Sequence, residues 1–123
     1  MPRKEPLING DWIVSGEILT RRDRNEEPDL NQIQTIKYEQ KIEQKGKFVI
    51  WKDVISTRMG VLTYYDQSWK LTLVDDEDNG TTIFVPKCPH RYDIWVGTYF
   101  ESGFNSGNKR QEQAVAHLEM RRN

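Results

Sequence analysis

The stretch from residue 58 to residue 86, RMGVLTYYDQSWKLTLVDDEDNGTTIFVP, places the strongest constraint on the fold. It contains three short segments rich in Val, Leu, Thr, Tyr and Trp, which are residues favoured on a pleated, half-buried surface. Over 69–73, Trp and Leu alternate with Lys and Thr. Successive strand side chains point to opposite faces, so this alternation predicts one buried and one solvated face. The stretch therefore predicts a β-meander with turns at 66–68 and 75–80.

The rest of the chain repeats this pattern of short apolar segments between polar turns. Strands are predicted over 10–19, 33–44, 48–55, 92–100 and 113–122. The segments near 29–44 and 112–122 are also rich in helix formers, so a helix in either place stays open. Pro86 is expected to end the last strand of the meander, because proline cannot donate a hydrogen bond to the sheet.

About eight short strands joined by tight turns are typical of an all-β domain. We expect a single antiparallel up-and-down barrel, because closing eight strands removes the exposed edges of the sheet. The alternatives are a β-sandwich, or an α+β fold that uses the two ambiguous segments as helices. The 123 residues are enough for one domain. We predict a flexible N-terminal arm over 1–9 and a single barrel domain over 10–123.

The charge balance and the distribution of apolar residues bear on location and partners. Acidic and basic residues nearly cancel, to a formal net charge of −1, which argues against a nucleic-acid partner. The sequence has no apolar run long enough to cross a bilayer, and its first residues lack the apolar region of a signal peptide. A single cysteine excludes an intrachain disulfide. These features predict a soluble, cytoplasmic protein with no membrane partner.

A short motif, Gly10-Asp11-Trp12, opens the first predicted strand. It resembles the Gly-x-Trp of calycins, the superfamily of lipocalins, fatty-acid-binding proteins and avidins. The resemblance implies a small barrel in which Trp12 plugs one end. It also implies that a basic residue of the last strand, Arg121 or Arg122, packs across this tryptophan. The resemblance rests on the architecture and on this one motif.

The aromatic residues are the best candidates for a binding site. The chain has 4 Trp and 5 Tyr, and core packing explains most of them because each ring buries a large area. In a barrel, some of these rings can also line a cavity and orient a ligand through hydroxyl and indole N–H groups. We predict that the barrel end and cavity wall are formed by Trp12, Tyr38, Tyr65, Trp69 and Trp95.

The residues with metal-binding or nucleophilic side chains match no known motif. The one cysteine, Cys88, and the two histidines, His90 and His117, form neither a four-ligand zinc pattern nor a nucleophile with an oriented base. The acidic run at 75–78 fails as a calcium loop, because its twelfth position is Pro86 instead of glutamate. We therefore expect no metal and no cofactor, and we favour a non-enzymatic protein while leaving enzymatic activity open.

Two polar connections, 22–32 and 102–112, are candidate interaction loops. Both carry basic residues, and the second also carries one phenylalanine. The residues that we select from them are Arg22, Arg24, Phe104, Lys109 and Arg110. The acidic neighbours of the first loop argue against a nucleic-acid groove.

The sequence supports two main hypotheses for the function. The first is a binding protein that holds a small, partly apolar or amphipathic ligand inside the barrel. The second is a non-enzymatic structural or interaction module, such as a viral or phage accessory protein, that acts through its loops and a homo-oligomer interface. A hydrolase or isomerase that uses the cavity is the least favoured interpretation.

Overall fold

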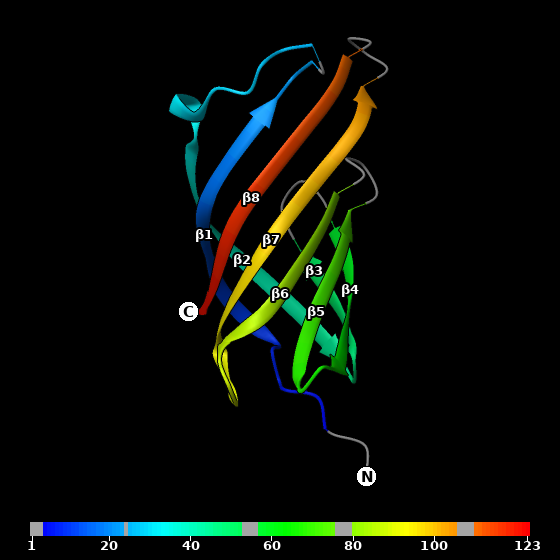
Figure 1. Ribbon diagram of the computed structural model, residues 1–123. Coiled ribbons are helices and arrows are strands. Elements are labelled where there is room, and N and C mark those ends of the chain that lie inside the picture. The colour runs from blue at the N-terminus through cyan, green and yellow to red at the C-terminus, as the bar shows by residue number, and fades with distance from the viewer. Residues whose placement is uncertain (1–3, 24, 53–56, 76–79, 106–109) are drawn as a thin grey trace.

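Eight strands pair in chain order and close into an antiparallel up-and-down barrel, which confirms the predicted fold class (Figure 1). The computed structural model describes residues 4–23, 25–52, 57–75, 80–105 and 110–123. The strands are β1 (Gly10–Arg21), β2 (Gln34–Lys45), β3 (Phe48–Lys52), β4 (Thr57–Tyr65), β5 (Ser68–Asp75), β6 (Gly80–Cys88), β7 (Arg91–Asn105) and β8 (Arg110–Arg122). The sheet closes because β8 pairs with β1.

The two segments that could have been helices are strands β2 and β8. In β8, inward-facing Ala114, Ala116, Leu118 and Met120 are buried, whereas exposed residues alternate with them. Burial of every second residue fits a strand and cannot be reproduced by a helix, so tertiary packing overrides the local preference for helix. The only helical element of the described chain is a short 3-10 turn, η1 (Leu30–Gln32), capped by the side chain of Asp29.

The two ends of the barrel differ in their connections. We call the end that carries the N-terminus the proximal end, drawn at the bottom in Figure 1, and the opposite end the distal end. The proximal turns have two residues each: Gly46-Lys47, Asp66-Gln67 and Pro89-His90. The distal connections are longer, and the longest, between β1 and β2, contains η1.

The strand β6 continues past Pro86 to Cys88, so the prediction that proline ends this strand was wrong. The pairing with β7 shifts register between these two residues, as in a β-bulge. Pro86 still pairs with Trp95, at the last position before the ladder is interrupted, and prolines in sheets are found at such irregularities.

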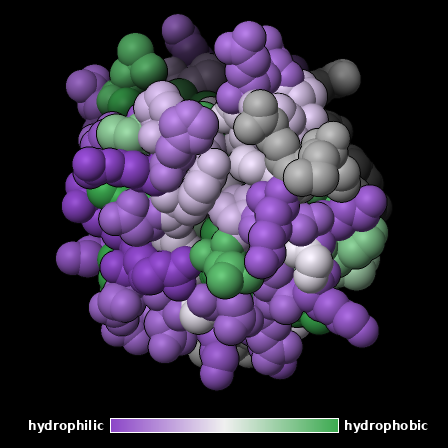
Figure 2. All heavy atoms as spheres, turned by 90° about the horizontal axis from the view of Figure 1, so that it is seen from below, coloured by the Kyte–Doolittle hydropathy of each residue, from purple (hydrophilic) through white to green (hydrophobic). Residues whose placement is uncertain are grey.

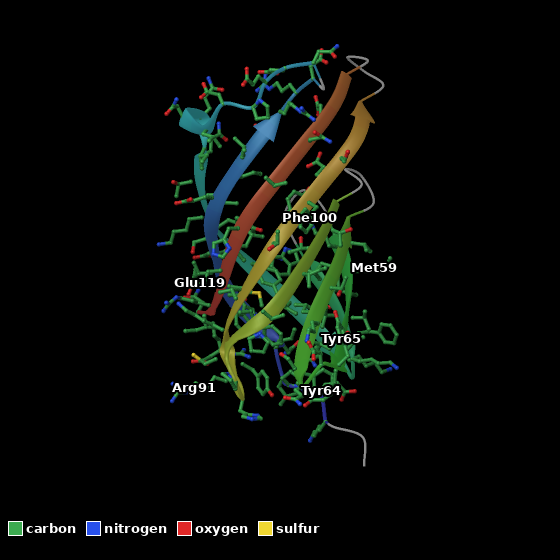
Figure 3. All side chains as sticks on the ribbon, viewed as in Figure 1. Met59, Tyr64, Tyr65, Arg91, Phe100 and Glu119 are labelled. Carbon is green, nitrogen blue, oxygen red and sulfur yellow. The ribbon has the colours of Figure 1, made fainter. Side chains whose placement is uncertain are left out.

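The outer face carries a row of apolar side chains that cross the sheet at one level. Direct cross-strand pairs connect Ile50 to Met59, Met59 to Val74, and Phe100 to Val115, with Thr81 between Val74 and Phe100. Each of the five apolar residues is exposed. We call these residues the outer apolar row; Met59 and Phe100 are labelled in Figure 3.

We predict that Gly16→Ala destabilises the barrel by about 1–3 kcal/mol, the usual cost of overpacking. A Cβ atom at Gly16 would lie 2.0 Å from the backbone oxygen of His117, so β1 and β8 would have to separate. Urea unfolding followed by tryptophan fluorescence measures the loss. The control is Glu17→Ala, an exposed neighbour whose loss should stay within about 0.5 kcal/mol. Equal stability of both variants would contradict the tight closure of β1 against β8.

Candidate functional site

A plug of three segments closes the proximal end of the barrel. Trp12 is fully buried, and its indole Nε1 donates a hydrogen bond to the carbonyl of Ile8 (2.8 Å). The guanidinium carbon of Arg122 lies 4.4 Å from the centre of the Trp12 ring. The same guanidinium donates to the carbonyls of Asn9 (3.0 Å) and Leu7 (2.7 Å). The last strand is thereby attached to the segment that precedes β1.

The structure thus distinguishes the two arginines proposed as partners of Trp12. Arg122 lies over the ring, whereas Arg121 is on the outer face and donates to Glu119 (3.1 Å). Adjacent residues of a strand point to opposite faces, so only one of the two can pack against the plug.

The end of the predicted flexible arm is part of this plug. Ile8 is fully buried, and its backbone N–H donates to Oε1 of Gln44 (2.7 Å). The side-chain amide of Gln44 donates in turn to the carbonyl of Pro6 (2.9 Å). Residues 6–9 are therefore held against the barrel, in contrast to the expectation of a loose arm over 1–9, because the barrel end needs an apolar cover.

Much of the barrel interior is filled by aromatic and aliphatic side chains. The Trp51 ring stacks on Phe84 with centroids 5.8 Å apart, and the indole of Trp95 donates to the carbonyl of Tyr92 (3.0 Å). Trp12 and Trp95 are fully buried, and Trp69 is 7% exposed. These three tryptophans, predicted to form the barrel end and cavity wall, lie within the packed core.

Tyr65 lies on the outside of the barrel, which corrects its predicted place in the cavity wall. Its side chain is 56% exposed and projects away from the barrel, as Figure 3 shows. The ammonium group of Lys70 lies 4.4 Å from the centre of its ring. Tyr64, the preceding residue, takes the inward side and packs edge-to-face against Trp69.

A cavity of about 270 Å³ occupies the distal half of the barrel, and we call it the distal cavity. Its described lining comes from β1, β2, β4, β7 and β8, and consists of Ile18, Ile36, Tyr38, Arg58, Tyr99, Glu101, Ala116 and Leu118. Ala116 is the smallest side chain of this lining and leaves space beside it. Of the five predicted cavity residues, Tyr38 alone lines it.

Polar groups converge on this cavity. The hydroxyl of Tyr99 donates a 2.8 Å hydrogen bond to Oε2 of Glu101. The guanidinium carbon of Arg58 lies 5.6 Å from the centre of the Tyr99 ring. Tyr99 is 8% exposed, and Arg58 is half-buried. A ligand here would meet a cation, a carboxylate and phenol hydroxyls beside an aliphatic wall.

The sequence contained a signal for Arg58 and Glu101 that the prediction missed. Arg58 shares its parity with Leu62 and Tyr64, and Glu101 shares its parity with Trp95 and Tyr99. A charged residue on the inward side of a strand is costly to bury without a reason. Such a residue therefore marks a position where the interior is wet or functional.

The predicted interaction loops are only partly described. Arg22 is exposed after the end of β1. Phe104 and Arg110 lie in strands, because β7 and β8 pair as far as Asn105 and Arg110, so the loop predicted over 102–112 is shorter. Their side chains, together with Arg24 and Lys109, lie outside the described residues.

The side chains considered for chemistry lie in two places. Cys88 is exposed at the end of β6, His90 is in the following turn, and His117 is on the outer face of β8. Within the described ranges, no group of three or more His, Cys, Asp or Glu side chains is placed to hold a metal ion. Nor does this part of the chain contain a helix that is long and apolar enough to cross a bilayer.

The function proposed below is therefore based on the geometry of the site, because the comparisons with known proteins found no match. No protein-family model matches the chain, and no curated protein matches its sequence.

We predict that Arg122→Ala lowers the free energy of unfolding by about 1–3 kcal/mol, since it removes two charge-assisted hydrogen bonds and a cation–π contact. Chemical denaturation followed by tryptophan fluorescence gives the value. Arg121→Ala is the matched control. It removes one exposed ion pair and should cost less than about 1 kcal/mol. A similar cost for both variants would show that the plug does not depend on the position of Arg122.

Proposed function

We propose that the barrel binds a small, partly apolar ligand in the distal cavity. The observation that carries this proposal is a partly open cavity on the inner side of the barrel, lined by both aliphatic and polar side chains. Concave sites with an apolar wall and a few convergent polar groups are the usual form of small-molecule sites.

The lining indicates the chemistry of the ligand. Ile18, Ile36 and Leu118 suit an apolar body, whereas Arg58 can only donate hydrogen bonds and the tyrosine hydroxyls can donate or accept them. A volume of about 270 Å³ suits a compact molecule. We therefore propose an amphipathic ligand with one polar end directed to Arg58.

The asymmetry of the barrel supports access from the distal end. The plug of Trp12, Ile8 and Arg122 covers the proximal end of the core. The longer connections are all at the distal end, and binding residues are often carried by such loops on a rigid scaffold. The same arrangement of plug and closed barrel supports our further proposal that the chain is calycin-like.

We expect Ala116→Phe to weaken binding of the fluorescent amphipathic probe 1-anilinonaphthalene-8-sulfonate at least about tenfold, because the new ring fills the space that an apolar ligand would occupy. A fluorescence titration measures the affinity. The control is His117→Phe, which adds the same ring to the exposed outer face of the same strand.

Arg58→Gln provides a second test that leaves the volume of the cavity nearly unchanged and should weaken binding of the probe several-fold. Undiminished probe affinity in both cavity variants would contradict binding in the distal cavity.

The outer apolar row supports a second candidate function, an interaction module that assembles with a second copy of this chain. The described residues of the row carry no charge, so two identical rows could meet without burying unpaired charges. Exposed apolar patches of this kind often mark interaction surfaces.

If the row forms this interface, the wild-type protein has the mass of at least two 14.6 kDa chains, and Phe100→Glu reduces it to one. Size-exclusion chromatography with light scattering measures the mass. Thr98→Glu, an exposed residue facing the same side of β7, should leave the mass unchanged. A wild-type monomer at high concentration would exclude this role.

A further inference from the structure

We propose that a second site, at the proximal end, binds a flat aromatic anion such as a nucleoside monophosphate. A groove of about 490 Å³ lies there between the β4–β5 turn, the β6–β7 turn and the segment before β1. The residues that carry the argument are Lys4, Tyr64, Trp69, Lys87, His90 and Tyr92. We call it the proximal groove; it shares no described lining residue with the distal cavity.

Three aromatic rings of the proximal groove are held in place by packing. Trp69 meets Tyr64 edge-to-face, with centroids 5.4 Å apart and an interplanar angle of 67°. Tyr92 packs against the buried Trp95 at 6.0 Å, and its carbonyl accepts the Trp95 indole hydrogen bond. Figure 2 views this end, where side chains of intermediate hydropathy, drawn pale, gather near the centre among hydrophilic ones. The half-buried rings of Tyr64 and Tyr92 can offer stacking surfaces to a planar ligand, and Trp69, which is 7% exposed, supports Tyr64 from the core.

The charge of the groove differs from that of the whole chain. Lys4, Lys87 and His90 line it, and none of its described lining residues is acidic, although the protein has a net charge of −1. The ammonium group of Lys87 lies 3.5 Å from a carboxylate oxygen of Glu119, outside the groove. An ion pair this exposed is weak, so an anion in the groove can compete for the lysine.

The backbone at the rim gives an independent reason to look for a function. His90 has a φ of 63°, and it follows Pro89 in a two-residue turn. Proline followed by a positive φ is the pattern of a type II turn, in which glycine or asparagine is favoured at the second position. At the facing turn, Asp66 and Gln67 both have a positive φ, of 53° and 61°, which is the usual geometry of a two-residue hairpin turn. Strained positions that keep a full side chain occur often at binding sites, which supports a role for the imidazole.

The ligand chemistry follows from these parts. Aromatic faces suit a flat ring, and two ammonium groups with an imidazole suit a phosphate or a similar anion. A groove of about 490 Å³ is within the range of small-molecule sites. We test the site with AMP and 1-naphthyl phosphate, which carry both features, and with adenosine and inorganic phosphate, which carry one each.

The experiment is an NMR titration of the folded full chain with these four probes. We expect both phosphorylated aromatics to shift the indole signal of Trp69, and adenosine and phosphate to bind at least about tenfold more weakly. If neither AMP nor 1-naphthyl phosphate binds, the proposal is overturned. It is also overturned if inorganic phosphate or adenosine binds with the same affinity as AMP, because either the aromatic ring or the phosphate would then contribute nothing to recognition.

Variants then locate the bound probe. Lys87→Gln and His90→Gly should each weaken AMP binding about threefold to tenfold, since each removes one charged or hydrogen-bonding partner. Glycine is favoured at a positive φ, so His90→Gly should keep the unfolding temperature at or above that of the wild type.

Lys41→Gln, on the exposed outer face of β2, is the matched control. Unchanged AMP affinity in both groove variants would contradict the site. Ala116→Phe should leave AMP binding intact, which separates this site from the distal cavity.

Discussion

The pairing of β1 with β8 is the constraint on which the rest of the structure depends. It runs in continuous register from Trp12 opposite Arg122 to Arg21 opposite Gln113. Gly16 permits the close approach of the two strands, because any Cβ atom there would collide with the backbone of β8. The closure removes both sheet edges, and edges left open would be templates for association with other chains. It also fixes which residues point inward and brings the first and last strands together at the plug.

The interior is divided along the barrel axis into a filled half and a hollow half. Large buried side chains, such as the stacked rings of Trp51 and Phe84, fill much of the interior. The distal half has smaller side chains on β8 and carries Arg58 and Glu101 on its inner face. In the function proposed above, binding takes place in the distal half, whereas the buried core provides most of the stability.

Much of the fold could be predicted from the sequence because alternation records the two faces of each strand. The inward parity of Trp69 and Leu71, and of Leu118 and Met120, follows from the residue pattern alone. The same pattern also predicts closure, since short turns between consecutive strands leave few other arrangements. In β2 and β8 the residues also favour a helix, but the burial of every second side chain determines that these segments are strands.

The candidate site was harder to predict. The alternation of apolar and polar residues shows which face of the sheet a side chain is on, but it does not show how far along the barrel axis the side chain lies. Depth depends on the stagger between strands, which a single sequence does not reveal. Trp95 and Tyr99 lie on the same face of β7, yet the first is in the packed proximal core and the second lines the distal cavity. Tyr64 and Tyr65 are equally aromatic, and the register of β4 with β5 decides which of them faces inward.

The most direct test of this account is chemical-shift mapping of the isotopically labelled protein with 1-anilinonaphthalene-8-sulfonate. The account predicts that the largest backbone amide shifts occur at residues around the distal cavity, such as Ile36, Tyr99 and Ala116, while Trp12 in the plug is little affected. Shifts confined to the outer face, around Met59 and Phe100, would contradict a ligand site inside the barrel. Such a result would identify the outer apolar row as the functional surface.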